Sequence, residues 1–200
     1  MKIEAIIFDL GRVLVDVDFS GLFNKYTNPG NNPDFSFTLE QVMTEEWFIE
    51  HSSGKCNDEQ FFQKVRENYN IDVSLDEFKR EWASIFKPMP EMETFLKQTA
   101  KKYPVGLLSD TDAIHWNFLL KEYPFLKMFT NPILSFEIGA MKPAEICYLK
   151  AADSVNTVIE NCLFIDDRQV NVDGAVKAGM QAVQFESNEK LKDFFKMNNL

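Results

Sequence analysis

Carboxylates that directly follow short apolar runs are the residues of this sequence best placed to do chemistry. Asp9 follows the run 5–8, and the adjacent pair Asp166 and Asp167 follows the run 162–165. A carboxyl group at the end of a buried strand is held rigidly at the edge of a sheet, where it can act as a nucleophile or bind a metal ion. Because paired hard oxygen ligands suit Mg²⁺, the pattern predicts a carboxylate site for this ion.

Two further segments carry polar groups that favour an anion. Ser109 and Asp110 follow the apolar run 105–108 and are followed by Thr111 and Asp112. Hydroxyl and backbone N–H groups between a strand and a helix can cradle an anion. Lys142 precedes Pro143, which favours the first turn of a helix, and a cation at that end of a helix calls for an anion nearby.

Each of these segments also has an ordinary structural explanation. Asp9 can cap the loop after it, and the stretch 109–112 can cap a helix. The pair 166–167 can form a solvated acidic turn, and Lys142 can be an exposed surface residue. The functional interpretation therefore depends on a fold that brings the segments together.

The apolar runs that precede these polar residues are typical of buried strands in a parallel sheet. They cover residues 5–8, 105–108, 132–134, 162–165 and 182–185, and helical patterns at 113–123, 145–152 and 170–178 separate the later ones. This alternation predicts a doubly wound, Rossmann-like α/β fold. In such folds ligands bind beyond the carboxyl ends of the strands, where Asp9, Ser109 and Asp166 are expected to meet.

Residues 17–88 differ from the rest, because they show aromatic-rich helical periodicity and no convincing strand. Asn57 begins a predicted helix that runs to Tyr69, and a capping box at Ser74 begins another that runs through Phe86. The turn-rich segment 28–33 is expected to form a loop. We therefore expect a core formed by residues 1–16 and 89–200, with an inserted α-helical cap at 17–88.

Composition limits the partners. The 200 residues are 45% hydrophobic, enough for a packed core, and the formal net charge of −10 disfavours nucleic acid and membrane surfaces. Cys56, Cys147 and Cys162 show no disulfide or zinc spacing, so we expect buried, reduced thiols. With neither a signal-peptide pattern nor an apolar run long enough to span a membrane, the expected location is the cytoplasm.

Taken in order, these segments resemble the haloacid dehalogenase superfamily, which includes many phosphatases. The resemblance rests on Phe8-Asp9-Leu10-Gly11, the strand end at Ser109, the segment Ser135-x-Glu137-x-Gly139-x-x-Lys142-Pro143, and Ile165-Asp166-Asp167. It implies a Rossmann-like core with a helical cap and a Mg²⁺-dependent reaction on a small phosphorylated metabolite. Asp9 would be the nucleophile, and Ser109, Asp110 and Lys142 would hold the phosphoryl group. Mg²⁺ would bind Asp9, the Gly11 carbonyl, Asp166 and Asp167.

Gly11 departs from the pattern of many phosphatases in the superfamily, which have an acid/base Asp two residues after the nucleophile. Similar Asp-Leu-Gly segments occur in a branch that includes bacterial sugar-phosphate phosphatases such as α-D-glucose-1-phosphate phosphatase. Without the carboxylate, esters with good leaving groups are expected to react fastest, unless another residue supplies the proton. The candidates for that role are Asp16, Asp110, Asp112 and His115, whereas His51 is interpreted as structural.

Two other functions remain compatible with the same residues. A 2-haloacid dehalogenase also attacks through an Asp, but it needs no Mg²⁺, so the pair Asp166 and Asp167 argues against it. The other is a regulatory protein that binds phosphate or metal without turnover. Phosphate release measured with and without Mg²⁺ separates the three.

Overall fold

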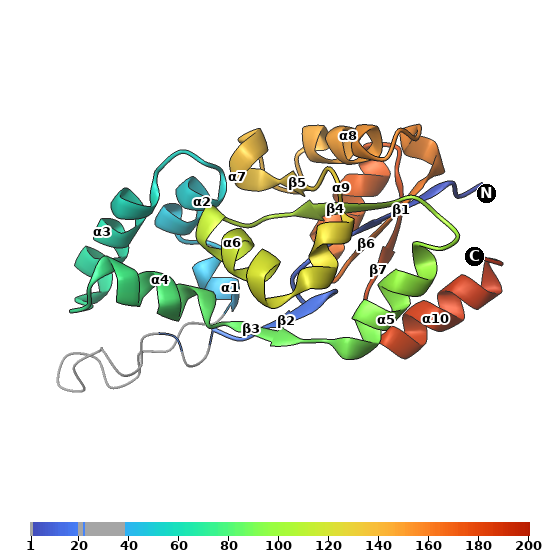
Figure 1. The fold of residues 1–200 in the computed structure, drawn as a ribbon. Helices are drawn as coiled ribbons and strands as arrows, with labels where there is room; N and C mark the ends of the chain where they lie inside the picture. The colour runs from blue at the N-terminus through green and yellow to red at the C-terminus, as the bar shows by residue number, and fades with distance from the viewer. Residues whose placement is uncertain (1, 20–21, 23–38) are drawn as a thin grey trace.

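A computed structural model of the protein describes residues 2–19, 22 and 39–200, shown in Figure 1. The predicted loop at 28–33 lies outside these residues. At the centre is a five-stranded parallel sheet in the order β5-β4-β1-β6-β7. Its strands are β1 (Ala5–Phe8), β4 (Val105–Ser109), β5 (Ile133–Leu134), β6 (Cys162–Asp166) and β7 (Gln181–Gln184). The predicted α/β class is confirmed.

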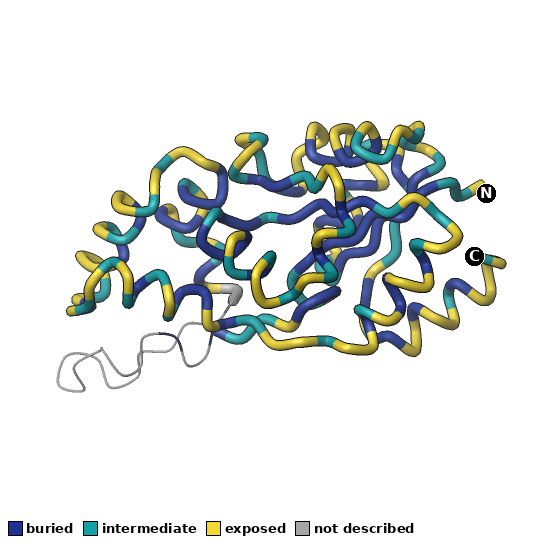
Figure 2. Tube along the Cα trace, viewed as in Figure 1, coloured by how far each residue is buried: buried dark blue, intermediate teal, exposed yellow. Residues whose placement is uncertain are grey.

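Helices cover both faces of this sheet, and its strands β1 and β6 are buried along their whole length (Figure 2). In β1, Ile6 and Phe8 pack with α5 (Pro90–Thr99), α6 (Ala113–Glu122) and α10 (Asn188–Met197). Ala5 and Ile7 pack on the opposite face with α8 (Glu145–Ser154) and α9 (Gln169–Lys177). Each fully buried large side chain contributes about 1.5–3 kcal/mol, so the central strand is firmly held.

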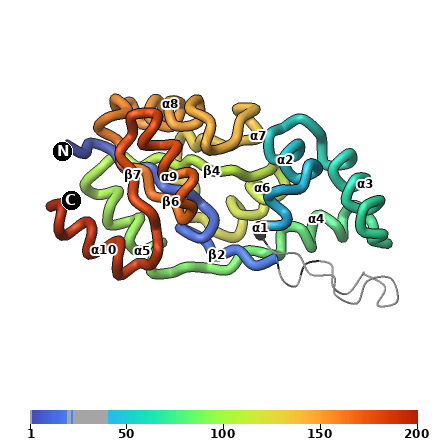
Figure 3. Tube along the Cα trace, turned by 180° about the vertical axis from the view of Figure 1, so that it is seen from behind, coloured from blue at the N-terminus to red at the C-terminus, as the bar shows by residue number. Residues whose placement is uncertain are grey.

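A second group of helices lies at the end of the molecule where α2, α3 and α4 are seen in Figure 3. It contains α1 (Leu39–Val42), α2 (Glu46–Ser52), α3 (Asp58–Tyr69) and α4 (Leu75–Ala83), which pack around an aromatic cluster that includes Trp47, Phe61 and Trp82. The predicted capping boxes are both present, from Asn57 to Gln60 and from Ser74 to Glu77.

The expectation that residues 17–88 contain no strand is wrong at both margins. β2 (Val15–Val17) and β3 (Phe86–Pro88) form an antiparallel pair where the chain enters and leaves the helical group. The helix predicted through Phe86 therefore ends early, at Ala83. Three-residue strands are too short for a period of two to show in the sequence.

The remaining elements are short. They are the 3₁₀ turns η1 (Pro124–Met128) and η2 (Ile159–Asn161) and the helix α7 (Ser135–Ile138). Pro143 lies before α8 rather than in its first turn, because that helix begins at Glu145. Cys147 and Cys162 are buried free thiols as expected, but Cys56 is only half-buried. Within the described ranges, no helix is both long and apolar enough to cross a bilayer.

One glycine allows the backbone of the helical group to approach the core closely. Gly54 follows α2 with a φ of +68°, and a Cβ atom there would lie 2.2 Å from the backbone oxygen of Phe136 in α7. Gly139 has a similar φ of +73°, but a Cβ atom there would meet nothing within 4 Å. At both positions an alanine would be strained by the backbone conformation, but only at Gly54 would it also meet a close contact.

We predict that Gly54→Ala destabilises the protein clearly more than Gly139→Ala. The left-handed backbone alone costs an alanine roughly 1–2 kcal/mol, and only Gly54→Ala adds a collision with backbone. Urea unfolding of both variants and the wild type measures the difference. Equal losses of unfolding free energy would show that the contact between Gly54 and Phe136 is not tight.

Candidate functional site

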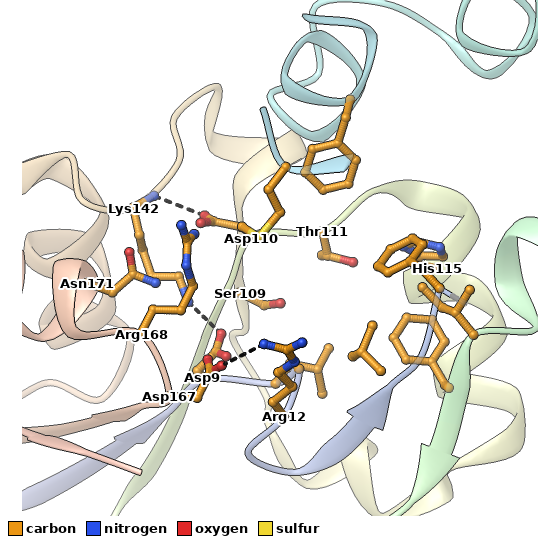
Figure 4. Close-up of a pocket in the computed structure, with 18 residues that line it drawn as sticks. Asp9, Arg12, Ser109, Asp110, Thr111, His115, Lys142, Asp167, Arg168 and Asn171 are labelled. Carbon is orange, nitrogen blue, oxygen red and sulfur yellow. Dashed lines mark hydrogen bonds and ion pairs between the residues drawn. The ribbon is translucent and has the colours of Figure 1, made fainter. Parts of the chain in front are cut away.

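The polar strand ends meet at one edge of the sheet, beside the helical group. A cavity of about 90 Å³ lies at this edge, and Figure 4 shows the side chains that line it. Six of the seven residues that the resemblance assigns to the site line it: Asp9, Gly11, Ser109, Asp110, Lys142 and Asp167. Asp166 lies beneath them, fully buried at the end of β6. The expected convergence of sequence-distant residues is confirmed.

Three carboxylates lie close together at this edge, and two of them, Asp9 and Asp167, line the cavity. One oxygen each from Asp9, Asp166 and Asp167 lies within 4.8 Å of the others. The first comes from the end of β1 and the other two from the end of β6, and these strands are neighbours in the sheet. Several oxygen ligands of hard character in one place suit a divalent cation such as Mg²⁺.

Lys142 is the cation that the structure places in this cluster. Its Nζ atom lies 2.5 Å from Asp9 Oδ1 and 2.8 Å from Asp166 Oδ2. The ammonium group is buried, and it also lies 5.5 Å from the centre of the Phe164 ring. A lysine in this position pairs with two of the three carboxylates, and its single positive charge offsets part of theirs.

Burial and crowding shift the protonation of these groups. Burial raises the pKa of Asp9 to about 8, the Lys142 ammonium opposes the shift, and the Asp166 charge adds to it. Burial would lower the pKa of Lys142, but Asp166, Asp9 and Asp110 outweigh it and hold the pKa well above the usual value. Burial, with the Asp166 charge next, also raises the pKa of Asp167. A carboxylate that resists ionisation next to a lysine marks a place where further positive charge is favourable.

Asp166 is held by donors that the sequence reading missed. Asn171 donates from Nδ2 to both of its carboxylate oxygens at 3.1 and 3.0 Å, and the backbone N–H of Arg168 donates to Oδ1 at 2.8 Å. Asn171 is in the first turn of α9, five residues after Asp166, and this spacing was the available signal. These bonds fix the carboxylate that Lys142 also contacts.

Two arginines at the cavity were also not anticipated. Arg12 and Arg168 both line it, and the Arg12 guanidinium lies 3.8 Å from Asp167 Oδ2. Arg12 has a positive φ of 59°, a left-handed conformation that few residues other than glycine adopt. The available signal for Arg12 was its position directly after Gly11, next to the predicted site; its positive charge alone does not distinguish it from a surface arginine.

Comparison with known proteins decides the family. The model of the haloacid dehalogenase-like hydrolases matches residues 3–179. The chain belongs to this family. The superfamily predicted from Asp9, Ser109, Lys142 and Asp166-Asp167 is therefore confirmed.

The similarity of this hydrolase to known proteins extends over nearly its whole length. It is 25% identical to a D-ribitol-5-phosphate phosphatase of Bacteroides thetaiotaomicron, over 92% of this chain and 93% of the relative. A crystal structure of a HAD-family enzyme from the same organism, in complex with magnesium and inorganic phosphate, matches with a TM-score of 0.82 at 23% identity. That match covers 96% of this chain and 99% of the other. L-2-haloacid dehalogenase from Xanthobacter autotrophicus matches with a TM-score of 0.69 at 19% identity, covering 96% and 81%.

Part of the cavity lining is apolar. Five apolar residues of the lining, which we call the apolar wall, are Phe19, Met43, Phe48, Ile85 and Phe86. Met43 and Phe48 belong to the helical group, while Phe86 is in β3. The cavity therefore combines charged side chains from the strand ends with an apolar wall.

The two histidines differ in their position relative to the cavity. His115 lines the cavity, and its Nε2 atom is 2.9 Å from the backbone oxygen of Trp82. His51 is buried, stacks on Phe61 and contacts Asp58 through Nε2 at 3.1 Å. His51 is not among the residues that line the cavity, in agreement with a structural role.

We predict that Lys142→Met lowers the unfolding free energy by about 3–5 kcal/mol at pH 8, because it leaves buried carboxylates without their cation. The loss should be smaller at pH 5. The reason is that the folded-state pKa of Asp9 is raised to about 8, so at pH 5 Asp9 keeps its proton and needs no cation. The stability that such a carboxyl group contributes is fully present below its pKa in the unfolded chain. It is lost as the pH rises through its pKa in the folded protein.

Urea unfolding at the two pH values, in EDTA, measures this effect. Lys121→Met is the matched control, because the Lys121 side chain is 82% exposed. A loss at pH 8 no greater than in this control would contradict the role given to the Lys142 ion pairs.

Proposed function

We propose that this hydrolase is a Mg²⁺-dependent phosphatase of small phosphorylated metabolites, with sugar or polyol phosphates as its substrate class. The observation that carries the proposal is the cluster of Asp9, Asp166 and Asp167 around Lys142 at the edge of the sheet. The D-ribitol-5-phosphate phosphatase that it resembles supports the substrate class, and the neighbouring structure with magnesium and phosphate supports the ion.

Each residue at the site has a proposed role. Asp9 is the nucleophile, and Ser109, Asp110 and Lys142 hold the phosphoryl group. Mg²⁺ is held by Asp9, the backbone carbonyl of Gly11, Asp166 and Asp167, whose arrangement fits a hard cation. When bound, the ion offsets the negative charges of the carboxylates and the phosphate.

The protein's own groups account for the remaining chemistry. An anionic carboxylate approaches an anionic phosphate only where fixed positive charge offsets both, and the buried Lys142 ammonium supplies such charge next to Asp9. Attack by Asp9 on phosphorus displaces the alcohol and leaves an aspartyl-phosphate, which water hydrolyses. The asparagine and backbone donors to Asp166 hold Lys142 where the phosphoryl group binds.

We also propose that residues 17–88 act as a cap over this site, with the core formed by residues 1–16 and 89–200. The pairing of β2 with β3 at both ends of the helical group supports this division, and so does the apolar wall. A cap that contributes Met43 and Phe48 to the cavity would help to select the alcohol portion of the substrate.

A dehalogenase function has one observation in its favour, the similar fold of L-2-haloacid dehalogenase. Folds host many functions, so the chemistry of the site decides. A dehalogenase needs a nucleophilic Asp but no metal-binding carboxylates beyond it. The proximity of Asp166 and Asp167 to Asp9 therefore favours the phosphatase.

We predict that the wild-type protein releases phosphate from a panel of phosphorylated metabolites with Mg²⁺ and loses this activity in EDTA. Asp167→Ala should reduce both activity and Mg²⁺ affinity by about 100-fold or more, since even outer-shell changes at metal sites cost 10–100-fold. Asp173→Ala, at an exposed position of α9, is the control and should retain both.

Three results would contradict the proposal. Full activity in EDTA would exclude a required metal. Halide release from 2-haloacids without phosphate release would establish the dehalogenase. Tight phosphate binding without turnover of any ester, including p-nitrophenyl phosphate, would indicate a regulatory protein.

A further inference from the structure

A phosphatase that cleaves an alkyl ester needs an acid for the departing oxygen, and Gly11 offers no side chain for this. Five residues with side chains that titrate between pH 3 and 11 in ordinary peptides line the cavity within the described part of the chain. They are Asp9, Asp110, His115, Lys142 and Asp167. Asp9 and Asp167 belong to the carboxylate cluster, and Lys142 is paired with two of its members, which leaves Asp110 and His115.

Four residues were candidates to replace the missing acid, and the surroundings of three of them, His115, Asp112 and Asp16, argue against this role. Both nitrogens of His115 face protein acceptors, with Nε2 2.9 Å from the Trp82 carbonyl oxygen and Nδ1 3.1 Å from Asp112 Oδ2. Asp112 is fully buried and accepts bonds from the Trp82 indole and the His115 backbone N–H. Asp16 is exposed on β2 and is not among the residues that line the cavity.

Asp110 lies where a proton donor would be useful. It directly follows Ser109, at the end of β4, and lines the cavity that contains Asp9. Its Oδ1 atom accepts a hydrogen bond from the backbone N–H of Lys142 at 3.0 Å, which fixes the carboxyl group. Within the described ranges, this is the one hydrogen bond made to that carboxyl group, so Oδ2 is available to carry a proton.

The surroundings of Asp110 favour its protonated form. Burial raises its pKa, against the attraction of the Lys142 ammonium and the bond from the Lys142 backbone. Charged and titratable groups face it from several elements: Lys142 before α8, Asp166 at the end of β6, Arg168 before α9, and Cys147 and Tyr148 in α8.

We propose that Asp110 is the general acid and base of this phosphatase, in place of a carboxylate at position 11. This inference rests on the proposed function. As Asp9 attacks phosphorus and the ester P–O bond breaks, the Asp110 proton passes to the departing oxygen and the alcohol leaves. The Asp110 carboxylate then takes a proton from the water that attacks the aspartyl-phosphate, which restores the acid and releases phosphate.

This role changes the expectation drawn from Gly11. The wild type should hydrolyse unactivated alkyl esters well, and dependence on a good leaving group should be a property of a variant without the Asp110 proton. Asp110→Asn is the variant of choice, because the amide oxygen can still accept the bond from the Lys142 N–H. Asp16→Asn is the matched control, since Asp16 Oδ1 also accepts a backbone bond, from Val17, outside the cavity.

The test compares kcat/KM for glycerol phosphate and for p-nitrophenyl phosphate, whose leaving group departs without a proton. Because kcat/KM reports the steps up to loss of the alcohol, Asp110→Asn should lower it for glycerol phosphate by about 10²- to 10⁴-fold. The loss for p-nitrophenyl phosphate should be clearly smaller, because its leaving group needs no proton and only the contribution of Asp110 to holding the phosphoryl group is affected. Asp16→Asn should match the wild type on both.

The pH profile gives a second readout that a merely structural role would not move. In the wild type and in Asp16→Asn, kcat/KM for glycerol phosphate should fall as the pH rises and Asp110 loses its proton, and Asp110→Asn should lack this descending limb. Equal losses on both esters, or a descending limb that persists unchanged in Asp110→Asn, would overturn the proposal for Asp110. Absence of phosphate release from either ester by the wild type would instead refute the phosphatase function.

Discussion

The buried ion pairs of Lys142 are the interaction on which the rest of this structure depends. The Lys142 ammonium joins Asp9 to Asp166, and the lysine is 133 residues from the first of these along the chain. β1 and β6 must be neighbours for both carboxylates to reach one cation, and the parallel order of the sheet meets this condition. Burying Lys142, Asp9 or Asp166 without its partners would cost free energy, so the position of each of these side chains restricts the positions of the other two.

The same arrangement explains how a strongly acidic protein can accept a phosphate. The formal charge of −10 acts over the whole surface, whereas the cavity contains Lys142, Arg12 and Arg168 at short range. Burial raises the pKa of Asp9 to about 8 and the Asp166 charge adds to the shift, so a cation bound among the carboxylates would favour the ionised, nucleophilic form of Asp9. Stability and reactivity thus depend on the same charges.

The sequence predicted the features that arise from local pattern. Apolar runs placed the strands that end at Asp9, Ser109 and Asp166, and the capping boxes at Asn57 and Ser74 marked the starts of α3 and α4. It did not predict features that are recognisable only from the contacts they make in the folded chain. β2 and β3 are recognisable only once they pair, and Asn171 and Arg168 acquire meaning from the Asp166 carboxylate that they contact. The same limit applied to Asp110, Asp112 and His115, whose hydrogen-bond partners distinguish them although their residue types do not.

The central claim, that Asp9 takes the phosphoryl group before water does, can be tested through the stereochemistry at phosphorus. A substrate phosphorothioate made chiral with sulfur and two oxygen isotopes is hydrolysed with Mg²⁺ in water labelled with the third oxygen isotope, and the configuration of the released thiophosphate is analysed. Two successive in-line displacements, first by Asp9 and then by water, each invert the configuration, so the account predicts net retention. Net inversion would mean that water attacks the substrate directly, and it would contradict the role of Asp9 as a covalent nucleophile.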